Sequence, residues 1–148
     1  MRGPTQTESF MPLVQLVYAS RPFGFDQATL SNLLLDSRRA NERDDITGAL
    51  IARHDLYLQL LEGPQSKVEA VYSRILNDDR HVEITKLVDR RIETRFFPGW
   101  AMRDDPAASW VWSIEEVRDG AIERTTEDEV LGFFSRLADQ GVVPPRET

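Results

Sequence analysis

Four polar side chains stand out because each lies in an otherwise apolar segment. Tyr18 and Gln59 occur in LVQLVYAS and LYLQLLEG, two runs with the composition of buried strands, and Ser37 and Asn41 lie four residues apart at helical spacing. A buried side-chain amide without partners costs about 1–3 kcal/mol, so Gln59 is expected to have one. Together, a phenol, a hydroxyl and two amides suit an aromatic heterocycle that carries carbonyl and ring-nitrogen acceptors.

Each of these residues also has a purely structural explanation. Tyr18 reads as a core tyrosine with its hydroxyl at an edge, Asn41 as a residue near a helix C-terminus, and Gln59 as an edge-strand residue satisfied by backbone. The binding interpretation rests on convergence, because in the topology expected below the first and third strands can lie side by side under the first helix.

Other kinds of catalytic or binding motif are missing from the sequence. It contains no GxGxxG, GxxxxGK[ST] or GxSxG pattern, and its two histidines, His54 and His81, are too far apart to predict a metal site. The acidic pairs Asp44–Asp45 and Asp78–Asp79 fall in expected turns, where adjacent carboxylates are usually solvated. A hydrolase is therefore not favoured.

The elements that must position the four side chains follow from the apolar periodicity. The expected order is strand, helix, strand, strand, helix, strand, strand, over residues 13–20, 26–40, 46–53, 56–62, 66–77, 83–92 and 100–103. Asp26 is the expected N-cap of the first helix. This βαββαββ order predicts an α+β, ferredoxin-like sandwich with both helices on one face of the sheet.

Two further helices are expected after this unit, near residues 109–118 and 126–140. Their apolar faces could cover the other side of the sheet or meet a second subunit. A homo-oligomer is the expectation drawn from the large side chains of this set, Trp110, Trp112, Phe133 and Phe134.

Length and charge set the domain organisation. The 148 residues fit one domain, with residues 1–11 as a polar tail, residues 12–103 as the core unit and residues 104–148 as a helical extension. Residues 1–103 hold 14 acidic and 14 basic side chains, whereas residues 104–148 hold 11 acidic and 4 basic ones, which argues against a nucleic-acid partner for the extension. The absence of cysteine and of a long apolar run predicts a cytoplasmic protein outside the membrane.

Five motifs in order resemble those of the BLUF family, blue-light sensors that use flavin. They are LVYAS, NERDDITGAL, YLQLLEGP, NDDRH and FPGWAMR, and they span residues 12–103. Two positions depart from the family pattern: Ala40 stands where relatives often have His or Asn, and Asp45 stands where Gly is common before ITG.

The resemblance implies non-covalently bound FAD between the two helices, although FMN stays open. Tyr18 and Gln59 would lie beside the isoalloxazine ring, and Asn41 would bond a ring carbonyl edge with Ser37 nearby. The residues implied toward the ribityl and phosphate end are Asp78, Arg80 and His81. Trp100 and Met102 would lie on the last strand near Gln59, one of them packing inward, and would relay the signal.

The resemblance further implies a photoreceptor without enzymatic activity. Light-driven electron and proton transfer from Tyr18 would rearrange the hydrogen bonds of Gln59, and the signal would leave through the last strand and the C-terminal helices to a separate effector protein. The alternative is a ferredoxin-like ligand-binding or interaction module without a chromophore. An acylphosphatase-type hydrolase is disfavoured because a suitable anion loop with its arginine is missing.

Overall fold

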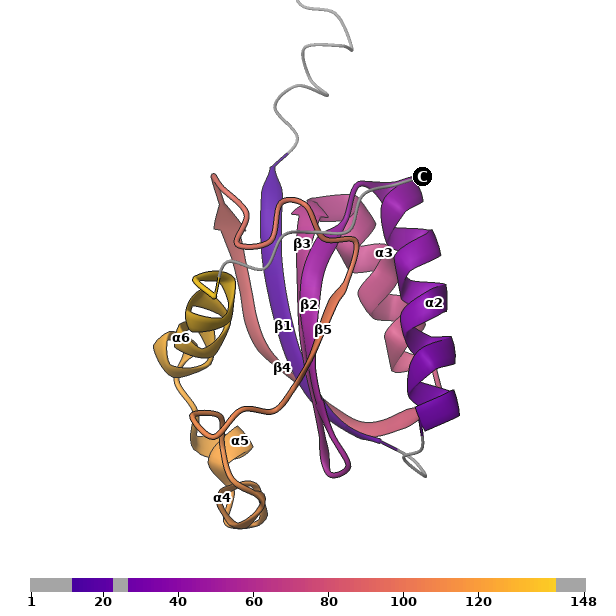
Figure 1. Ribbon diagram of the computed structural model, residues 1–148. Coiled ribbons are helices and arrows are strands. Elements are labelled where there is room, and N and C mark those ends of the chain that lie inside the picture. The colour runs from indigo at the N-terminus through magenta and orange to yellow at the C-terminus, as the bar shows by residue number, and fades with distance from the viewer. Residues whose placement is uncertain (1–11, 23–26, 141–148) are drawn as a thin grey trace, which may run out of the picture.

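A computed structural model describes residues 12–22 and 27–140, apart from the side chain of His81. A central five-stranded sheet has the strand order β4-β1-β3-β2-β5 and carries helices on both faces (Figure 1). Its strands are β1 (Leu13–Pro22), β2 (Thr47–Arg53), β3 (Leu56–Pro64), β4 (His81–Ile92) and β5 (Arg103–Pro106). The helices are α2 (Gln27–Asp44), α3 (Gln65–Leu76), α4 (Ile114–Arg118), α5 (Ala121–Arg124) and α6 (Glu127–Ala138).

The strand pairing confirms the ferredoxin-like prediction. β1 lies between β3 and β4 and is antiparallel to both, while β3 also pairs antiparallel with β2. Both helices expected in the core unit, α2 and α3, pack on one face of the sheet. The first and third strands are therefore neighbours, as the binding interpretation required.

Alternation along the strands creates a separate core on each face of the sheet. On β1, Leu16 and Tyr18 join the core under α2 and α3, whereas Val17 and Ala19 join the core under α4, α5 and α6. Of the two roles left open for the C-terminal helices, covering the sheet is therefore the observed one.

This packing accounts for the aromatic set that motivated the oligomer expectation. Trp112 and Phe134 are only 4% and 0% exposed within a single chain. Phe133 packs against Trp110 and Trp112, with ring centroids 6.3 and 5.2 Å apart. The homo-oligomer stays a prediction, now without this support.

The last strand begins later than predicted. Residues 100–103 were expected to form it, but β5 covers Arg103–Pro106 and pairs parallel with β2. The reason is a turn in which the Trp100 amide donates to the Phe97 carbonyl and the Trp100 carbonyl accepts from Gly48 at 3.0 Å. Only at Arg103 does the chain run alongside β2, so β5 crosses the domain boundary expected after residue 103.

The first helix ends four residues later than predicted, at Asp44. It stops where Asp45 adopts a left-handed backbone with φ 59°, a conformation that glycine adopts more readily. Arg95 donates to the carbonyl of Asp45 at 3.0 Å and to its carboxylate at 3.2 Å, which helps to hold this turn in place. The expected N-cap Asp26 and the expected tail, residues 1–11, lie outside the described residues.

The expectation of two C-terminal helices is also corrected. The Ser113 side chain accepts from the Glu116 amide, and this capping box starts α4 at residue 114 rather than at 109. Gly120, with φ 96°, separates α4 from α5, a short helix that the periodicity did not predict. In residues 12–22 and 27–140, none of the helices is long and apolar enough to cross a bilayer.

Candidate functional site

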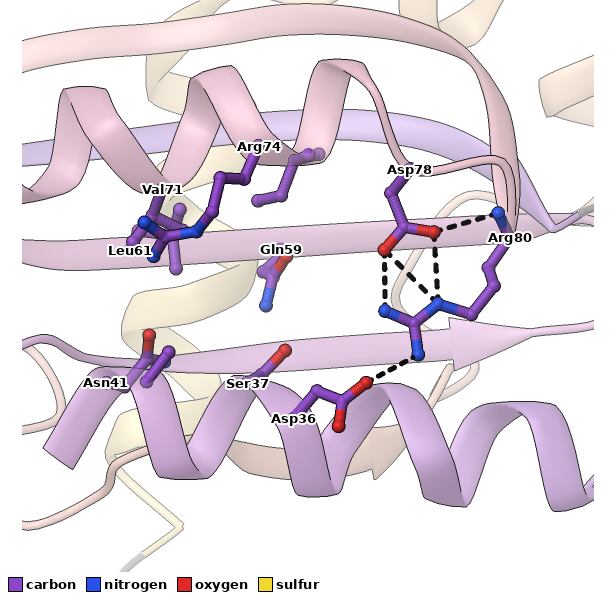
Figure 2. Close-up of a pocket in the computed structure, with 11 residues that line it drawn as sticks. Asp36, Ser37, Asn41, Gln59, Leu61, Val71, Arg74, Asp78 and Arg80 are labelled. Carbon is purple, nitrogen blue, oxygen red and sulfur yellow. Dashed lines mark hydrogen bonds and ion pairs between the residues drawn. The ribbon is translucent and has the colours of Figure 1, made fainter. Parts of the chain in front are cut away.

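A cavity of about 300 Å³ lies between α2 and α3, over the middle of the sheet (Figure 2). Gln59 and Leu61 of β3 form the floor of the cavity, and α2 contributes Ser37, Ala40 and Asn41. The remaining lining residues are Asp36, Val71, Arg74, Ile75, Asp78 and Arg80. Three of the four polar residues singled out in the sequence therefore line one cavity.

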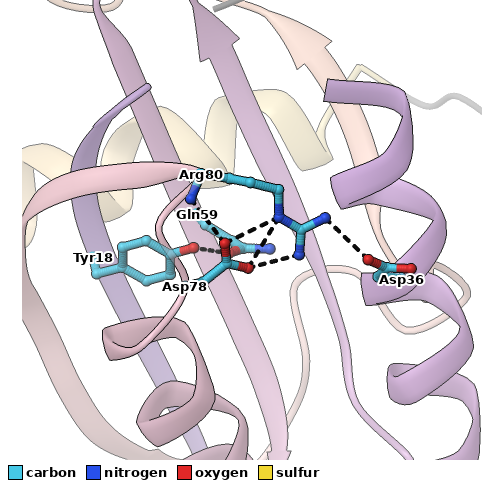
Figure 3. A network of polar contacts seen from close by, with 5 residues as sticks. All are labelled: Tyr18, Asp36, Gln59, Asp78 and Arg80. Atoms are coloured by element: carbon cyan, nitrogen blue, oxygen red, sulfur yellow. Dashed lines mark hydrogen bonds and ion pairs between the residues drawn. The ribbon is translucent and has the colours of Figure 1, made fainter. Parts of the chain in front are cut away.

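Tyr18, the fourth, meets the cavity through Gln59. The two residues are direct partners in the β1–β3 register, and the Tyr18 hydroxyl donates a hydrogen bond to Gln59 Oε1 (Figure 3). Gln59 Nε2 lies 3.3 Å from Met102 Sδ. A buried chain of contacts thus runs from a phenol through an amide to a thioether.

Burial raises the pKa of Tyr18 well above its usual value, and the nearby Asp78 carboxylate adds to that effect. The phenol is consequently a hydrogen-bond donor, not a phenolate, at any physiological pH. The Tyr72 ring packs against the Tyr18 ring at a centroid distance of 6.0 Å.

Asn41 holds the backbone that precedes Met102. Its side chain is 1% exposed, and Nδ2 donates to the Ala101 carbonyl at 2.7 Å. One N–H of the Asn41 side chain therefore bonds the protein backbone, while the side chain also borders the cavity, where Ser37 lies one helical turn away. The site role predicted for Asn41 toward a ring stays a prediction.

Arg38 is a residue that the sequence reasoning missed. Its Nε donates to the Met102 carbonyl at 3.0 Å and its Nη2 to Asp104 Oδ1 at 2.8 Å. Together with Asn41, it fixes both peptide units on either side of the Met102 side chain to α2. Its position three residues before Asn41 places it on the same helix face, but a bond to a backbone carbonyl leaves no signal in the sequence.

Arg80 closes one end of the cavity. Its guanidinium contacts Asp78 Oδ2 at 2.6 Å and Asp36 Oδ2 at 3.0 Å, which links the turn after α3 to α2 (Figures 2 and 3). These two carboxylates, Asp78 foremost, raise the pKa of Arg80 above its usual value. His81 begins β4 next to it, but its side chain is not among those described.

The structure separates the two candidates on the last strand. Met102 is buried in the core under α2 and α3, in contact with Gln59, whereas Trp100 packs against the core on the opposite face. Met102 is therefore the one of the pair that packs inward beside Gln59, whereas the expectation that Trp100 also lies near Gln59 is wrong. The cause is the turn at residues 97–100, which directs the Trp100 ring to the opposite face.

A second missed residue, Glu62, anchors the segment that leads into this turn. Its carboxylate accepts from the amides of Phe96 and Phe97 at 2.8 and 3.0 Å and from Gln15 Nε2 at 2.7 Å. Burial raises the pKa of Glu62, against the opposing effect of these donors. The glutamate of the LLEG run thus attaches the backbone of residues 96 and 97 to β3.

The family model for BLUF, described as sensors of blue light using FAD, matches residues 13–103. This chain belongs to the BLUF family. The match covers β1 to β4, both cavity helices and the segment with Met102, and it ends at the first residue of β5, so every predicted site residue falls inside it.

Relatives of this BLUF chain include light-regulated proteins. The blue light- and temperature-regulated antirepressor BluF of Escherichia coli (strain K12) is 38% identical over 107 residues, which is 66% of this chain and 26% of that protein. The photoactivated adenylate cyclase subunit beta of Euglena gracilis is 32% identical over 91 residues, 61% of this chain and 10% of that protein. The chain thus spans only a small part of the length of these two relatives.

The fold matches a solved BLUF structure along nearly all of its length. The dark-state structure of BlrB, a BLUF protein, superposes with a TM-score of 0.72 at 29% identity and covers 88% of this chain and 99% of its own. A bacterial light-regulated adenylyl cyclase superposes with a TM-score of 0.62 at 29% identity, over 86% of this chain and 36% of that one.

The residues around the cavity fit the flavin that the family uses. Its volume is at the lower end of the range for small-molecule sites, about 300–1,000 Å³, and suits the ring portion of FAD. Leu61, Val71 and Ile75 offer apolar walls, while the amides of Asn41 and Gln59 offer hydrogen bonds to a ring edge. The Arg80 guanidinium at one end offers a charge for phosphate.

Proposed function

We propose that this chain is a blue-light photoreceptor in which Gln59 registers the absorption of a photon. The observation that carries the proposal is the buried sequence of contacts from Tyr18 through Gln59 to Met102, with Gln59 on the cavity wall. FAD would be held by Asn41 and Gln59 at the ring and by Arg80 toward the phosphates. When bound, the flavin absorbs blue light and, once excited, accepts an electron and a proton.

Tyr18 is the proposed donor of both. Its hydroxyl already points its proton at Gln59, and burial keeps the phenol protonated, so the group is ready to give up an electron and a proton together. The amide of Gln59 lies between the phenol and the cavity, where it can pass the proton on. When the electron and proton return, Tyr18 is restored and its chemistry leaves no trace.

The lasting change is then in the amide of Gln59. Its two ends have nearly the same shape but opposite hydrogen-bonding character, so the amide can exchange them at little packing cost. In the described arrangement Oε1 accepts from Tyr18 and Nε2 faces the Met102 sulfur. After an exchange Oε1 would face that sulfur, which cannot donate a hydrogen bond, and the contact with Met102 would be lost.

Met102 is the proposed exit of the signal. Its backbone is held by Arg38 and Asn41, and β5 follows directly. A displacement of Met102 would therefore also displace β5, a strand at the edge of the sheet. We propose that a separate effector protein reads this change and that the chain has no enzymatic activity of its own; the names of the two relatives, an antirepressor and a cyclase, show that light regulation in this family serves different outputs.

The test is the absorption spectrum of the purified chain after reconstitution with FAD. A bound flavin whose absorption shifts reversibly to the red under blue light is the expected result, because a hydrogen bond gained at a ring carbonyl stabilises the excited state. Tyr18→Phe and Gln59→Leu should keep the flavin and lose the shift. Tyr72→Phe, which removes the hydroxyl of the ring beside Tyr18, is the control and should keep the shift. A chain that binds no flavin would instead favour the chromophore-free module.

A further inference from the structure

Arg103 occupies a position that connects the two faces of the sheet. It follows Met102 directly and begins β5, so its side chain leaves the sheet on the face opposite to Met102. Although it carries a permanent charge, the side chain is only 5% exposed. A buried guanidinium needs specific partners to offset its desolvation.

The partners of Arg103 tie β5 to the last helix. Nη1 donates to the Leu137 carbonyl at 3.2 Å, and Nε contacts Asp105 Oδ2 at 2.9 Å. The guanidinium also stacks over the Trp100 ring at 5.6 Å. Leu137 lies in the last turn of α6, where the helix dipole attracts a cation, and its carbonyl accepts from Arg103 as well as from the Gln140 amide at 3.1 Å.

We infer that Arg103 is the positioning residue that couples the Gln59–Met102 contact to the C-terminal end of α6. The inference rests on the proposed function, since it assigns the route by which a displacement of Met102 leaves the site. Gln59 Nε2 contacts Met102 Sδ at 3.3 Å, Met102 is covalently joined to Arg103, and Arg103 reaches α6. A shift of the backbone at residue 102 must therefore move the guanidinium relative to Leu137.

Two further features favour this route. Arg38 holds the Met102 carbonyl, which belongs to the peptide unit that Arg103 shares, so that α2 and α6 are attached to opposite sides of one peptide bond. A second cavity, of about 170 Å³, lies beside the far contact and is lined by Asp105, Trp110 and Leu137 among others. This space allows the junction a second arrangement, which a close-packed core would resist.

The chain contains a matched control in Arg53. Its Nη1 donates to the Trp112 carbonyl at 2.7 Å and its Nη2 to Asp55 Oδ2 at 3.1 Å. Like Arg103, Arg53 donates to a backbone carbonyl in the C-terminal part of the chain and also contacts the carboxylate of the aspartate two residues later in the sequence. It lies at the opposite end of β2 from Ala49, the residue paired with Arg103. Loss of Arg53 should weaken the packing without interrupting the route from Met102.

The experiment compares hydrogen exchange in the dark and under blue light, with the full chain bound to FAD. In the unaltered chain, light should accelerate amide exchange in the last turn of α6 on the order of fivefold or more, the lower range of known coupling between sites. Arg103→Met should keep the red shift of the flavin and lose this light dependence. Arg53→Met should keep both. The lifetime of the red-shifted state should also change in Arg103→Met and not in Arg53→Met.

Equal light dependence of α6 in Arg103→Met and in the unaltered chain would overturn the inference. So would a red shift with no change in α6 of the unaltered chain, an outcome that leaves the proposed function intact. Failure of the proposed function is a different result, namely no red shift in any form. If Arg103→Met does not fold, Arg103→Lys takes its place, because a single ammonium keeps the charge but cannot bond Asp105 and Leu137 in the same fork; an undiminished response in that variant would equally refute the coupling.

Discussion

The two faces of the sheet are built from the same strands in opposite ways. Under α4, α5 and α6, aromatic rings pack edge to face, as with Phe97 and Phe134 at 6.4 Å and 88°. Under α2 and α3, a cavity of about 300 Å³ takes the place that side chains fill elsewhere, and the buried amides of Asn41 and Gln59 border it. The buried polar groups of the aromatic face, such as Glu62 and Arg103, instead bond the chain itself. One face therefore supplies stability, and the other gives up packing to keep a binding site. Substitutions on the two faces should separate folding from photochemistry.

The largest expected effect is on stability and lies on the aromatic face. Phe134→Ala removes a ring that is 0% exposed and should lower the free energy of unfolding by about 3–5 kcal/mol, as cavity-forming changes do. Denaturant titration measures it, and the flavin spectrum of the folded protein should be unchanged. Phe133→Ala, one residue away and half-buried, should cost distinctly less. Equal losses in the two variants would show that this face lacks the tightly packed centre described above.

The next effect should appear only on the cavity face. Arg38→Met removes two hydrogen bonds to the Met102–Asp104 segment. The lifetime of the red-shifted state should change several-fold as a result. The free energy of unfolding should fall by only about 1 kcal/mol, because the Arg38 side chain is 40% exposed. Arg39→Met, at the exposed neighbouring position, is the control. The lifetime is measured as dark recovery after a blue flash. Equal lifetimes in the two variants would contradict the role assigned to Arg38.

The contrast between the faces also explains what the sequence could predict. The pairing of Tyr18 with Gln59 could be anticipated, because the strand order followed from periodicity and both residues interrupt apolar runs. The contacts of Arg38 and Arg103 could not, because both arginines bond backbone carbonyls, which every residue carries. The start of β5 depended on where a turn ends, and this is set by tertiary bonds to Gly48 and Asn41.

A smaller effect is expected at the entrance of the cavity. Asp36 competes for the Arg80 guanidinium from a side chain that is 61% exposed, so the pair is worth at most about 1 kcal/mol. Asp36→Asn should make Arg80 Nη1 available to a phosphate, while Asp78 still holds Nε and Nη2, and should tighten FAD binding by up to about fivefold. Fluorescence titration measures the affinity, with Asp79→Asn as a control for the loss of one charge. Weaker binding in Asp36→Asn than in Asp79→Asn would place Arg80 away from the phosphates.

The last prediction is that the amplitude of the light-induced spectral shift does not change with pH near neutrality. Because burial raises the pKa of Tyr18, the contribution of this phenol to stability is present below its unfolded value of about 10 and is lost only as the pH rises through the higher folded value. The amplitude of the light-induced shift should therefore be constant from about pH 7 to pH 10. A fall in amplitude with a midpoint inside that window would mean that the donor ionises there and is not the buried Tyr18.

The central claim is that the amide of Gln59 exchanges its partners under light, and infrared difference spectroscopy tests it directly. The chain is labelled with ¹³C and ¹⁵N in its glutamine side chains, and spectra are taken before and after blue light. Gln15, the other glutamine buried in the described core, is held by Glu62 and Arg90 and should stay silent. We expect an amide carbonyl band that shifts on illumination and moves with the label; difference spectra without any label-sensitive band would contradict the account.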